Sequence, residues 1–260
     1  MSLNVNGYPI QPLAPNAVPM DTAGSLELGV FKTTATQEHA LGRRVELWDG
    51  RVFRYCKNGE AQIGAALMTQ SSVAPAETIN IEQVGQAMTA GDKTVRVLVT
   101  TSNGVVDGGL IGGTLLIRAN TGERYAYAIK NNKWIIGDTV MELELYDAIR
   151  VTTDETTKIT LFPNRYKDVI VAPTTLTGAV VGVTNLVIPA NHYFWAQTRG
   201  LAPMLVDADD TLVIGEKAGF PATAGTAGAV GVVGATDVVY GHVVAIGADG
   251  ETALIDLRLE

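Results

Sequence analysis

The chain has 260 residues, of which 47% are hydrophobic, only 6% are aromatic and 18% are charged. This length allows one large β domain or two smaller ones and excludes a disulfide-stapled miniprotein. The formal net charge of -8 argues against a general nucleic-acid binder, because phosphate affinity comes largely from lysine and arginine. The charged fraction lies below the roughly 25% usual for soluble domains, which predicts that part of the surface is buried between subunits.

Residues 1–30 are expected to form an extended N-terminal arm. Four prolines and no periodic apolar pattern argue against a helix there. A disordered terminus is the alternative, but the segment has more apolar side chains than a solvated tail needs. These are Leu3, Val5, Tyr8, Ile10, Leu13 and Val18. The first residues lack the charged and apolar regions of a secretory signal, so no export is expected.

The first predicted hairpin covers residues 45–55. Its apolar residues alternate on either side of Asp49 and Gly50. An Asp-Gly pair suits a type I′ turn, because both central residues of that turn need positive φ. The second strand contains Cys56, the only cysteine, which excludes an intrachain disulfide. With no base beside it, we expect an inert, half-buried thiol in a protein assembled in a reducing cytosol.

Short apolar runs separated by turn residues predict many further strands. A meander is expected at residues 115–119, 124–129 and 134–136, with Asn131 and Asn132 as its second turn. The other predicted strands are residues 158–162, 168–171, 185–188, 193–197, 204–206, 211–214, 239–246 and 252–259. Helical signal is limited to residues 80–90 and to residues 141–149, which also suit a strand. The prediction is an all-β barrel or sandwich of short antiparallel strands.

Composition also predicts the domain organisation. Residues 74–75 and the segment near Pro163 bracket a middle block whose hairpins look self-contained. We therefore expect residues 31–75 and 164–260 to form one main β domain, with residues 76–163 inserted as a second β-rich domain. The glycine-rich stretch at residues 218–239 carries Pro221, which favours a flexible loop over a membrane span.

No sequence motif for a metal, cofactor or nucleophile is found. The three histidines, His39, His192 and His242, do not have the spacing of a zinc site, and His192 is expected to be a hydrogen-bonded structural residue. No serine, cysteine or paired-carboxylate signature supports a hydrolase. We therefore expect a protein that is not an enzyme and that has no catalytic, cofactor-binding or metal-binding residues.

Two segments superficially resemble ligand loops. Residues 108–114 are glycine-rich but lack the Lys-Ser/Thr ending and following helix of a phosphate loop, so a turn or close backbone packing is expected. Asp207, Asp209 and Asp210 are the densest acidic cluster and could bind calcium. Because the later Glu and Gly of an EF-hand are missing, aspartates of a strand-joining turn are the simpler interpretation.

Two further segments, residues 42–55 and residues 193–207, resemble a family of tailed-phage virion proteins described as capsid decoration, cement or head-stabilising proteins. The first is similar to the family's early hairpin through Arg51, Phe53 and Tyr55. The second is similar to a later strand of the family through three residues within a stretch of six. These are Trp195, Gln197 and Gly200. The two segments cover about a quarter of the chain, and the middle block has no counterpart in the resemblance.

The resemblance implies a β-rich protein of the capsid exterior, assembled in the host cytoplasm. It also implies a homo-oligomer, usually a trimer, that clamps neighbouring major capsid protein subunits and performs no chemistry. Such a protein would act by multivalent burial of modest interfaces. The arm would then add along a neighbour's sheet edge or groove, and we expect Tyr8, Ile10 and Leu13 in that contact. Packing of these side chains on their own domain is the alternative.

Three other functions remain open from the sequence. A head fibre, tail or baseplate subunit shares the same composition. A carbohydrate- or receptor-binding β module would use exposed Trp48, Trp134 or Trp195 to stack on sugar rings, so buried tryptophans would count against it. A glycan hydrolase would need two carboxylates that converge only in three dimensions, about 5 to 10 Å apart. No nucleic-acid partner and no membrane association are expected.

Overall fold

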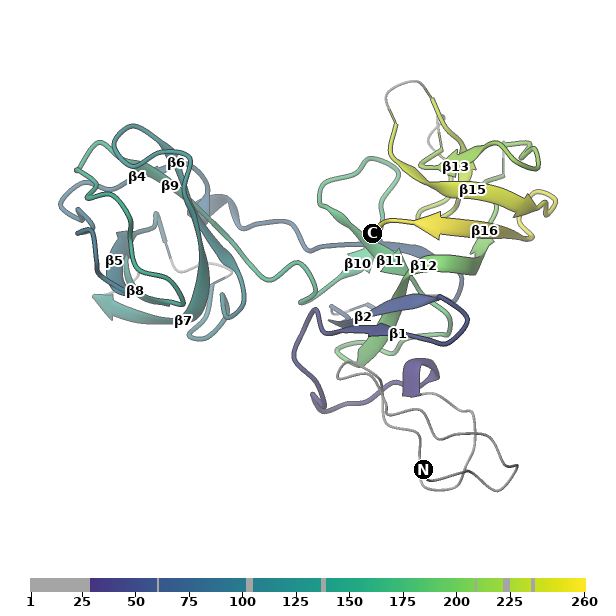
Figure 1. Ribbon diagram of the computed structural model, residues 1–260, viewed down its shortest axis with the longest axis horizontal. Coiled ribbons are helices and arrows are strands. Elements are labelled where there is room, and N and C mark those ends of the chain that lie inside the picture. The colour runs from purple at the N-terminus through teal and green to yellow at the C-terminus, as the bar shows by residue number, and fades with distance from the viewer. Residues whose placement is uncertain are drawn as a thin grey trace, which may run out of the picture. The chain divides into compact units, whose positions relative to one another are not determined.

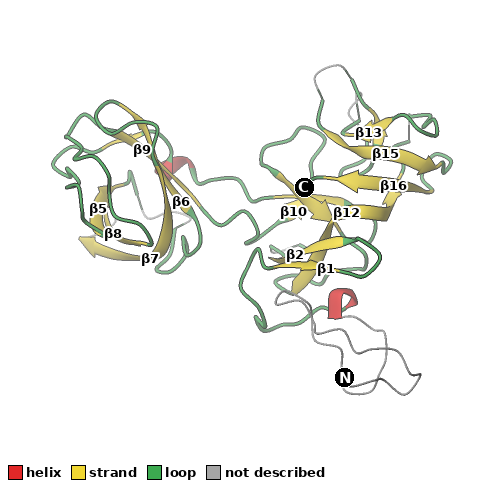
Figure 2. Cartoon of the chain, in the orientation of Figure 1, coloured by secondary structure: helices red, strands yellow, loops and turns green. Residues whose placement is uncertain are grey.

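In a computed structural model of the protein, the structure describes residues 29–59, 61–101, 105–136, 139–208, 210–221, 225–234 and 237–260. These residues form sixteen strands and two 3-10 helices (Figures 1 and 2), which confirms the all-β prediction. No helix among them is long and apolar enough to cross a membrane. The predicted arm lies outside the described residues except for its last two, which belong to the 3-10 helix η1, Gly29–Phe31.

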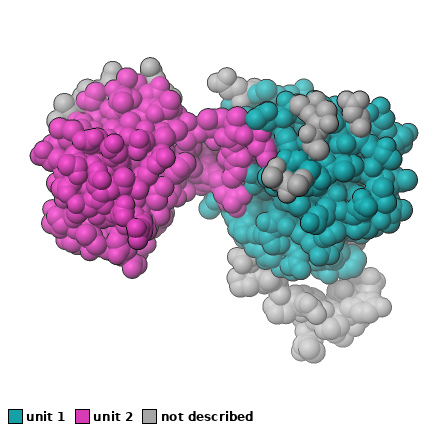
Figure 3. All heavy atoms as spheres, turned by 90° about the horizontal axis from the view of Figure 1, so that it is seen from above, with its two compact units in different colours: residues 1–69, 170–175, 180–260 teal, residues 70–169, 176–179 magenta. Residues whose placement is uncertain are grey.

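The chain divides into two compact units, which Figure 3 colours separately. The first unit comprises residues 1–69, 170–175 and 180–260, and the second comprises residues 70–169 and 176–179. The insertion is therefore longer than the expected 76–163. One reason is the buried amide of Gln70, which accepts hydrogen bonds from the backbone of Thr177 and Gly178 at 3.2 Å each and so links the two connecting segments.

The first unit is built on a ten-stranded sheet in the order β10-β3-β11-β12-β16-β15-β13-β14, with the β1–β2 hairpin joined to β12 through β2. Its strands are β1 Arg44–Glu46, β2 Val52–Lys57, β3 Met68–Gln70, β10 Ile170–Val171, β11 Val180–Val183, β12 Tyr193–Leu205, β13 Lys217–Gly219, β14 Gly231–Val232, β15 Val239–Ala245 and β16 Thr252–Arg258. The predicted closing hairpin is thus present as β15 and β16.

Strand β12 is the centre of this sheet, and it replaces two separate strands expected at residues 193–197 and 204–206. Its first half pairs with β2 and its second half pairs with β16. A β-bulge after Gln197 bends the strand without ending it. The buried Gln197 amide donates to the carbonyls of Arg199 and Leu201 at 3.0 and 2.9 Å, which satisfies backbone groups on the far side of the bulge.

The second unit is a six-stranded antiparallel sheet in the order β4-β9-β6-β7-β8-β5, curled around its own core in Figure 1. Its strands are β4 Ile81–Glu82, β5 Thr94–Leu98, β6 Thr114–Ala119, β7 Ala126–Ile136, β8 Val140–Leu145 and β9 Lys158–Phe162, and the 3-10 helix η2, Ala76–Thr78, precedes them. Its core is aliphatic, as the composition predicts, and includes Leu115, Ile117, Ile129, Met141 and Leu143.

A buried glutamine side chain joins the two edges of this sheet, beside a backbone hydrogen bond from Thr100 N–H to the Glu77 carbonyl at 3.2 Å. Gln83, directly after β4, accepts a hydrogen bond from the N–H of Leu98 at 2.8 Å and donates to the Leu98 carbonyl at 3.2 Å. Its amide also donates to the Ile81 carbonyl. The glutamine thus substitutes for a ladder partner between β4 and β5, and the six strands close into a barrel.

Two local predictions for the second unit are wrong, and one choice that the sequence left open is decided. Residues 80–90 form no helix, because Asn80 and Gly85 have positive φ and only β4 lies between them. For residues 141–149, which suited either a helix or a strand, the strand alternative is confirmed as β8. The expected turn at Asn131 and Asn132 is part of the continuous strand β7, since the Asn132 side chain is buried and accepts a hydrogen bond from Leu110 N–H at 2.7 Å.

Two predicted strands of the first unit are also wrong. Residues 211–214 are not in a strand. In residues 185–188 only Ile188 pairs, through an isolated bridge to Ile63. The real strand, β11, lies earlier, at Val180–Val183. Gly182 is needed there for packing, because a Cβ would lie 2.7 Å from the Gln197 carbonyl oxygen.

Candidate functional site

The two segments that carry the family resemblance lie side by side in the sheet. Strands β2 and β12 are antiparallel partners, with Tyr55 opposite Trp195 and Phe53 opposite Gln197. Gly200 also approaches β2 closely, because a Cβ there would lie 3.2 Å from the Cα of Arg51. Residues more than a hundred positions apart in the sequence therefore form one pair of neighbouring strands.

An aromatic cluster covers one face of the β2–β12 strand pair. The Tyr55 ring lies 5.0 Å from the Trp195 ring, edge to face, and stacks on Tyr193 at 5.8 Å. Val30 of η1 packs into the same cluster. Trp195 is only 2% exposed, so it is a core residue and cannot serve as a sugar-stacking surface.

His39 packs on this cluster and has a hydrogen-bond partner. Its ring lies 5.1 Å from Tyr55 and 5.3 Å from Trp195. The Arg43 guanidinium donates to Nδ1 at 2.9 Å, which leaves the proton on Nε2 because arginine cannot accept. Burial and the nearby Arg43 charge lower the pKa of His39, so the ring is a neutral packing residue near pH 7.

The turn between β1 and β2 differs from the expected type. Only Gly50 in this turn has positive φ, at 83°, and its N–H donates to the Leu47 carbonyl at 3.0 Å. A type I′ turn would need positive φ at Asp49 as well. The connection is instead a type I turn followed by a glycine bulge, which needs one left-handed residue.

Side chains on both sides stiffen this turn. Asp49 accepts hydrogen bonds from the backbone N–H of Arg51 at 3.1 Å and from its Nε at 2.7 Å. The Arg51 guanidinium carbon lies 5.8 Å from the Phe31 ring centroid and 5.9 Å from that of Phe53, within cation–π range. The tip is therefore a preorganised element.

Trp48 sits at the tip of this hairpin and is 87% exposed. No other large hydrophobic side chain among the described residues is as exposed. Trp134, by contrast, is half-buried, and its indole N–H donates to the Val105 carbonyl at 3.1 Å. Of the three tryptophans considered for ligand stacking, only Trp48 is presented to solvent.

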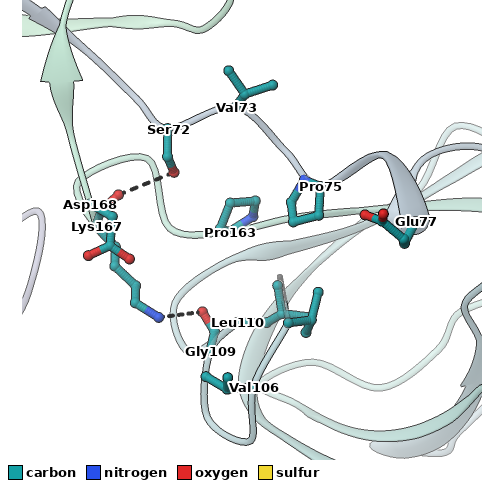
Figure 4. Close-up of a pocket in the computed structure, with 11 residues that line it drawn as sticks. Ser72, Val73, Pro75, Glu77, Val106, Gly109, Leu110, Pro163, Lys167 and Asp168 are labelled. Atoms are coloured by element: carbon teal, nitrogen blue, oxygen red, sulfur yellow. Dashed lines mark hydrogen bonds between the residues drawn. The ribbon is translucent and has the colours of Figure 1, made fainter. Parts of the chain in front are cut away.

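A cavity of about 520 Å³ opens on the second unit (Figure 4). We call it the proline–valine pocket, after its apolar lining. Lys167 crosses one side, with its ammonium donating to the Gly109 carbonyl at 2.9 Å, and Ser72 donates to the Lys167 carbonyl at 3.4 Å. The lining residues are Ser72, Val73, Pro75, Glu77, Val105, Val106, Gly109, Leu110, Pro163, Lys167 and Asp168.

Sequence reasoning missed this pocket, although it identified part of its wall. The glycine-rich segment at residues 108–114 forms tight turns with positive φ at Gly108 and Gly112, and a Cβ at Gly113 would lie 2.3 Å from the Phe162 carbonyl oxygen. The prediction of a turn and close packing is confirmed. The sequence offered no signal beyond the two valines before this segment, of which Val105 is buried in the core and only Val106 is exposed.

The acidic cluster holds turns together. Asp207 is fully buried, and its Oδ1 accepts a hydrogen bond from Thr226 N–H at 2.5 Å. Asp210 accepts one from Val232 N–H at 2.9 Å, and Asp209 lies outside the described residues. In the part of the chain that the structure describes, no three His, Cys, Asp or Glu side chains are arranged to hold a metal ion.

The remaining residues that the sequence analysis singled out have structural roles or lie outside the described residues. Cys56 is fully buried rather than half-buried, with its thiol donating to the Arg54 carbonyl at 3.4 Å. His192 Nδ1 lies 2.9 Å from the Ala190 carbonyl oxygen, as expected of a hydrogen-bonded structural histidine. Tyr8, Ile10 and Leu13 lie outside the described residues.

Comparison with protein-family models, with curated proteins and with solved structures found no match for this chain.

Proposed function

We propose that the chain is a structural protein of a tailed-phage virion that decorates the outer capsid lattice and stabilises it by bridging major capsid protein subunits. The observation that carries the proposal is the pairing of the two resembling segments. Tyr55 lies opposite Trp195 and Phe53 opposite Gln197 on β2 and β12. Two short similarities that arose by chance would have no reason to meet in one cluster, whereas parts of one inherited unit would.

The composition supports an assembled protein. Charged residues make up 18% of the chain, and the exposed large hydrophobic side chains are numerous on both units. In the proposed role, copies associate, as a trimer, and each copy adds contacts to the capsid that act at high effective concentration. The Pro-rich arm, with Tyr8, Ile10 and Leu13, supplies the capsid contact.

A co-sedimentation experiment tests this proposal. The full chain is mixed with empty capsids assembled from the major capsid protein of the same genome, in unexpanded and expanded form. We expect saturable binding to the expanded lattice and an increase in the temperature at which those capsids disassemble. A triple variant with Tyr8, Ile10 and Leu13 changed to Ser should bind weakly. No binding of the unmodified chain to either lattice would overturn the proposal.

A carbohydrate-binding module is the second candidate, and the exposed indole of Trp48 favours it. Sugar hydroxyls, however, need polar partners beside the stacking ring, and the adjacent Asp49 and Arg51 side chains are bonded to each other at 2.7 Å. Saturable binding to a glycan array that is lost in Trp48→Ala would favour the module over the virion role.

A further inference from the structure

Trp48 has the properties of an anchor residue. Tryptophan side chains are among the commonest hot spots at protein interfaces, and an indole left 87% exposed keeps a large apolar surface in water. The Asp49–Arg51 pair and the Gly50 bulge hold the turn in one geometry. An anchor on a stiff turn loses little conformational freedom when it binds.

The proline–valine pocket has the properties of a receptor for such a group. Val73 and Val106, on its rim, are 55% and 66% exposed, and Pro75 and Pro163 contribute further apolar wall. The Glu77 carboxylate can accept the indole N–H, and the Lys167 ammonium offers a cation for the face of the ring. The pocket thus offers partners for both the apolar body and the polar edge of an indole.

We propose that Trp48 of one copy inserts into the proline–valine pocket of a second copy. Each copy carries one indole and one pocket, on different units, so the contact is head-to-tail. Contacts of this kind form a closed ring when the rotation between copies closes, and an open chain otherwise. The low charged fraction of the chain, 18%, fits a protein that buries part of its surface against further copies.

The inference deepens the proposed function by naming the contact that joins the copies, and it rests on that function only for the biological role of the oligomer. Its test uses the chain alone, without capsids. Failure of capsid binding and failure of self-association are therefore separate results.

Size exclusion with light scattering over a range of concentrations measures the first consequence. Trp48→Ala removes the indole and Val106→Glu places a charge in the pocket, and each change should weaken self-association by roughly thirtyfold or more, as truncation of a hot spot does. Ile214→Ala and Val84→Glu change side chains that are 63% and 60% exposed on the first and second units and serve as matched controls. The controls should associate like the unchanged chain.

Mixing the two defective variants is the decisive experiment. The Trp48→Ala chain keeps its pocket, and the Val106→Glu chain keeps its indole, so an equimolar mixture should form a dimer and stop there. Emission from Trp48 should lie further to the blue in that mixture, and in the unchanged chain, than in the Val106→Glu chain alone. A mixture that stays monomeric, or single variants that associate normally, would overturn the proposal. If Trp48→Ala loses glycan binding while its self-association is unchanged, Trp48 binds a sugar instead.

Discussion

The carboxylate of Glu260, just beyond β16, ties the end of the chain to the centre of the sheet. It accepts hydrogen bonds from Arg54 at 2.5 Å and from Thr198 at 2.5 Å. Burial acts to raise the pKa of Glu260, but these hydrogen bonds and the positive charges of Arg54 and Arg44 outweigh it, so the pKa lies below its ordinary value. The carboxylate therefore stabilises the fold in its charged form.

This gives a pH-dependent prediction for Glu260→Gln. A carboxyl group with a lowered folded pKa adds stability above its unfolded pKa of about 4.3 and loses it as the pH falls through the folded value. The substitution should cost about 1 kcal/mol near neutral pH, since the group is partly exposed, and almost nothing well below both pKa values. Urea unfolding at about pH 7 and about pH 3 measures the difference. Glu155→Gln, at an exposed position, is the control and should show no such trend.

At the scale of elements, Gln83 gives the sharpest prediction. Glu at this position keeps an acceptor for Leu98 N–H but faces the carbonyls of Leu98 and Ile81 with no donor. We expect Gln83→Glu to destabilise the second unit by about 2 to 3 kcal/mol at neutral pH. Acid should restore part of this loss, because a protonated carboxyl group regains an O–H donor.

Hydrogen exchange at the Leu98 amide reports directly on this barrel closure. In the Gln83→Glu chain that amide should exchange faster at neutral pH than in the unchanged chain, while amides of β6 and β9 in the middle of the sheet change less. Equal protection in the two chains would show that β5 is held without the glutamine.

The strands that the sequence could predict are those whose signal is local. Residues 158–162 become β9, and the closing hairpin becomes β15 and β16, because alternation and a turn suffice to specify them. Strand β12 could not be predicted as one element, since its continuity depends on Gln197 satisfying backbone groups across a bulge. The sequence also could not predict that Gln83 closes the barrel, because its hydrogen-bond partner, Leu98, lies on another strand.

The candidate site, too, could be predicted from the sequence only where its signal is local. The hairpin that carries Trp48 follows from residues 45–55 alone, and only its turn type was wrong. Whether a tryptophan is exposed depends on what packs over it: Trp195 is buried by Tyr55 and His39, and Trp134 is tied to Val105. The proline–valine pocket is assembled from three separated segments, so no single stretch of sequence contains its signal.

At the scale of the whole molecule, the two units have separate cores. Sixteen buried residues of the second unit form one hydrophobic cluster, and among the described strands none of its sheet pairs with the sheet of the first unit. Two cores of this kind are expected to unfold in two steps, as multidomain proteins do. Truncation inside one core should then leave the other step unchanged.

Leu115→Ala and Ile255→Ala test this independence as a matched pair. Both side chains are fully buried, Leu115 in the second unit and Ile255 on β16 of the first. Each change should cost about 2 to 5 kcal/mol from lost burial and the cavity left behind. Calorimetry should show Leu115→Ala lowering one transition and Ile255→Ala the other. If both variants lower a single shared transition by similar amounts, the insertion folds together with its host and the two cores are not independent.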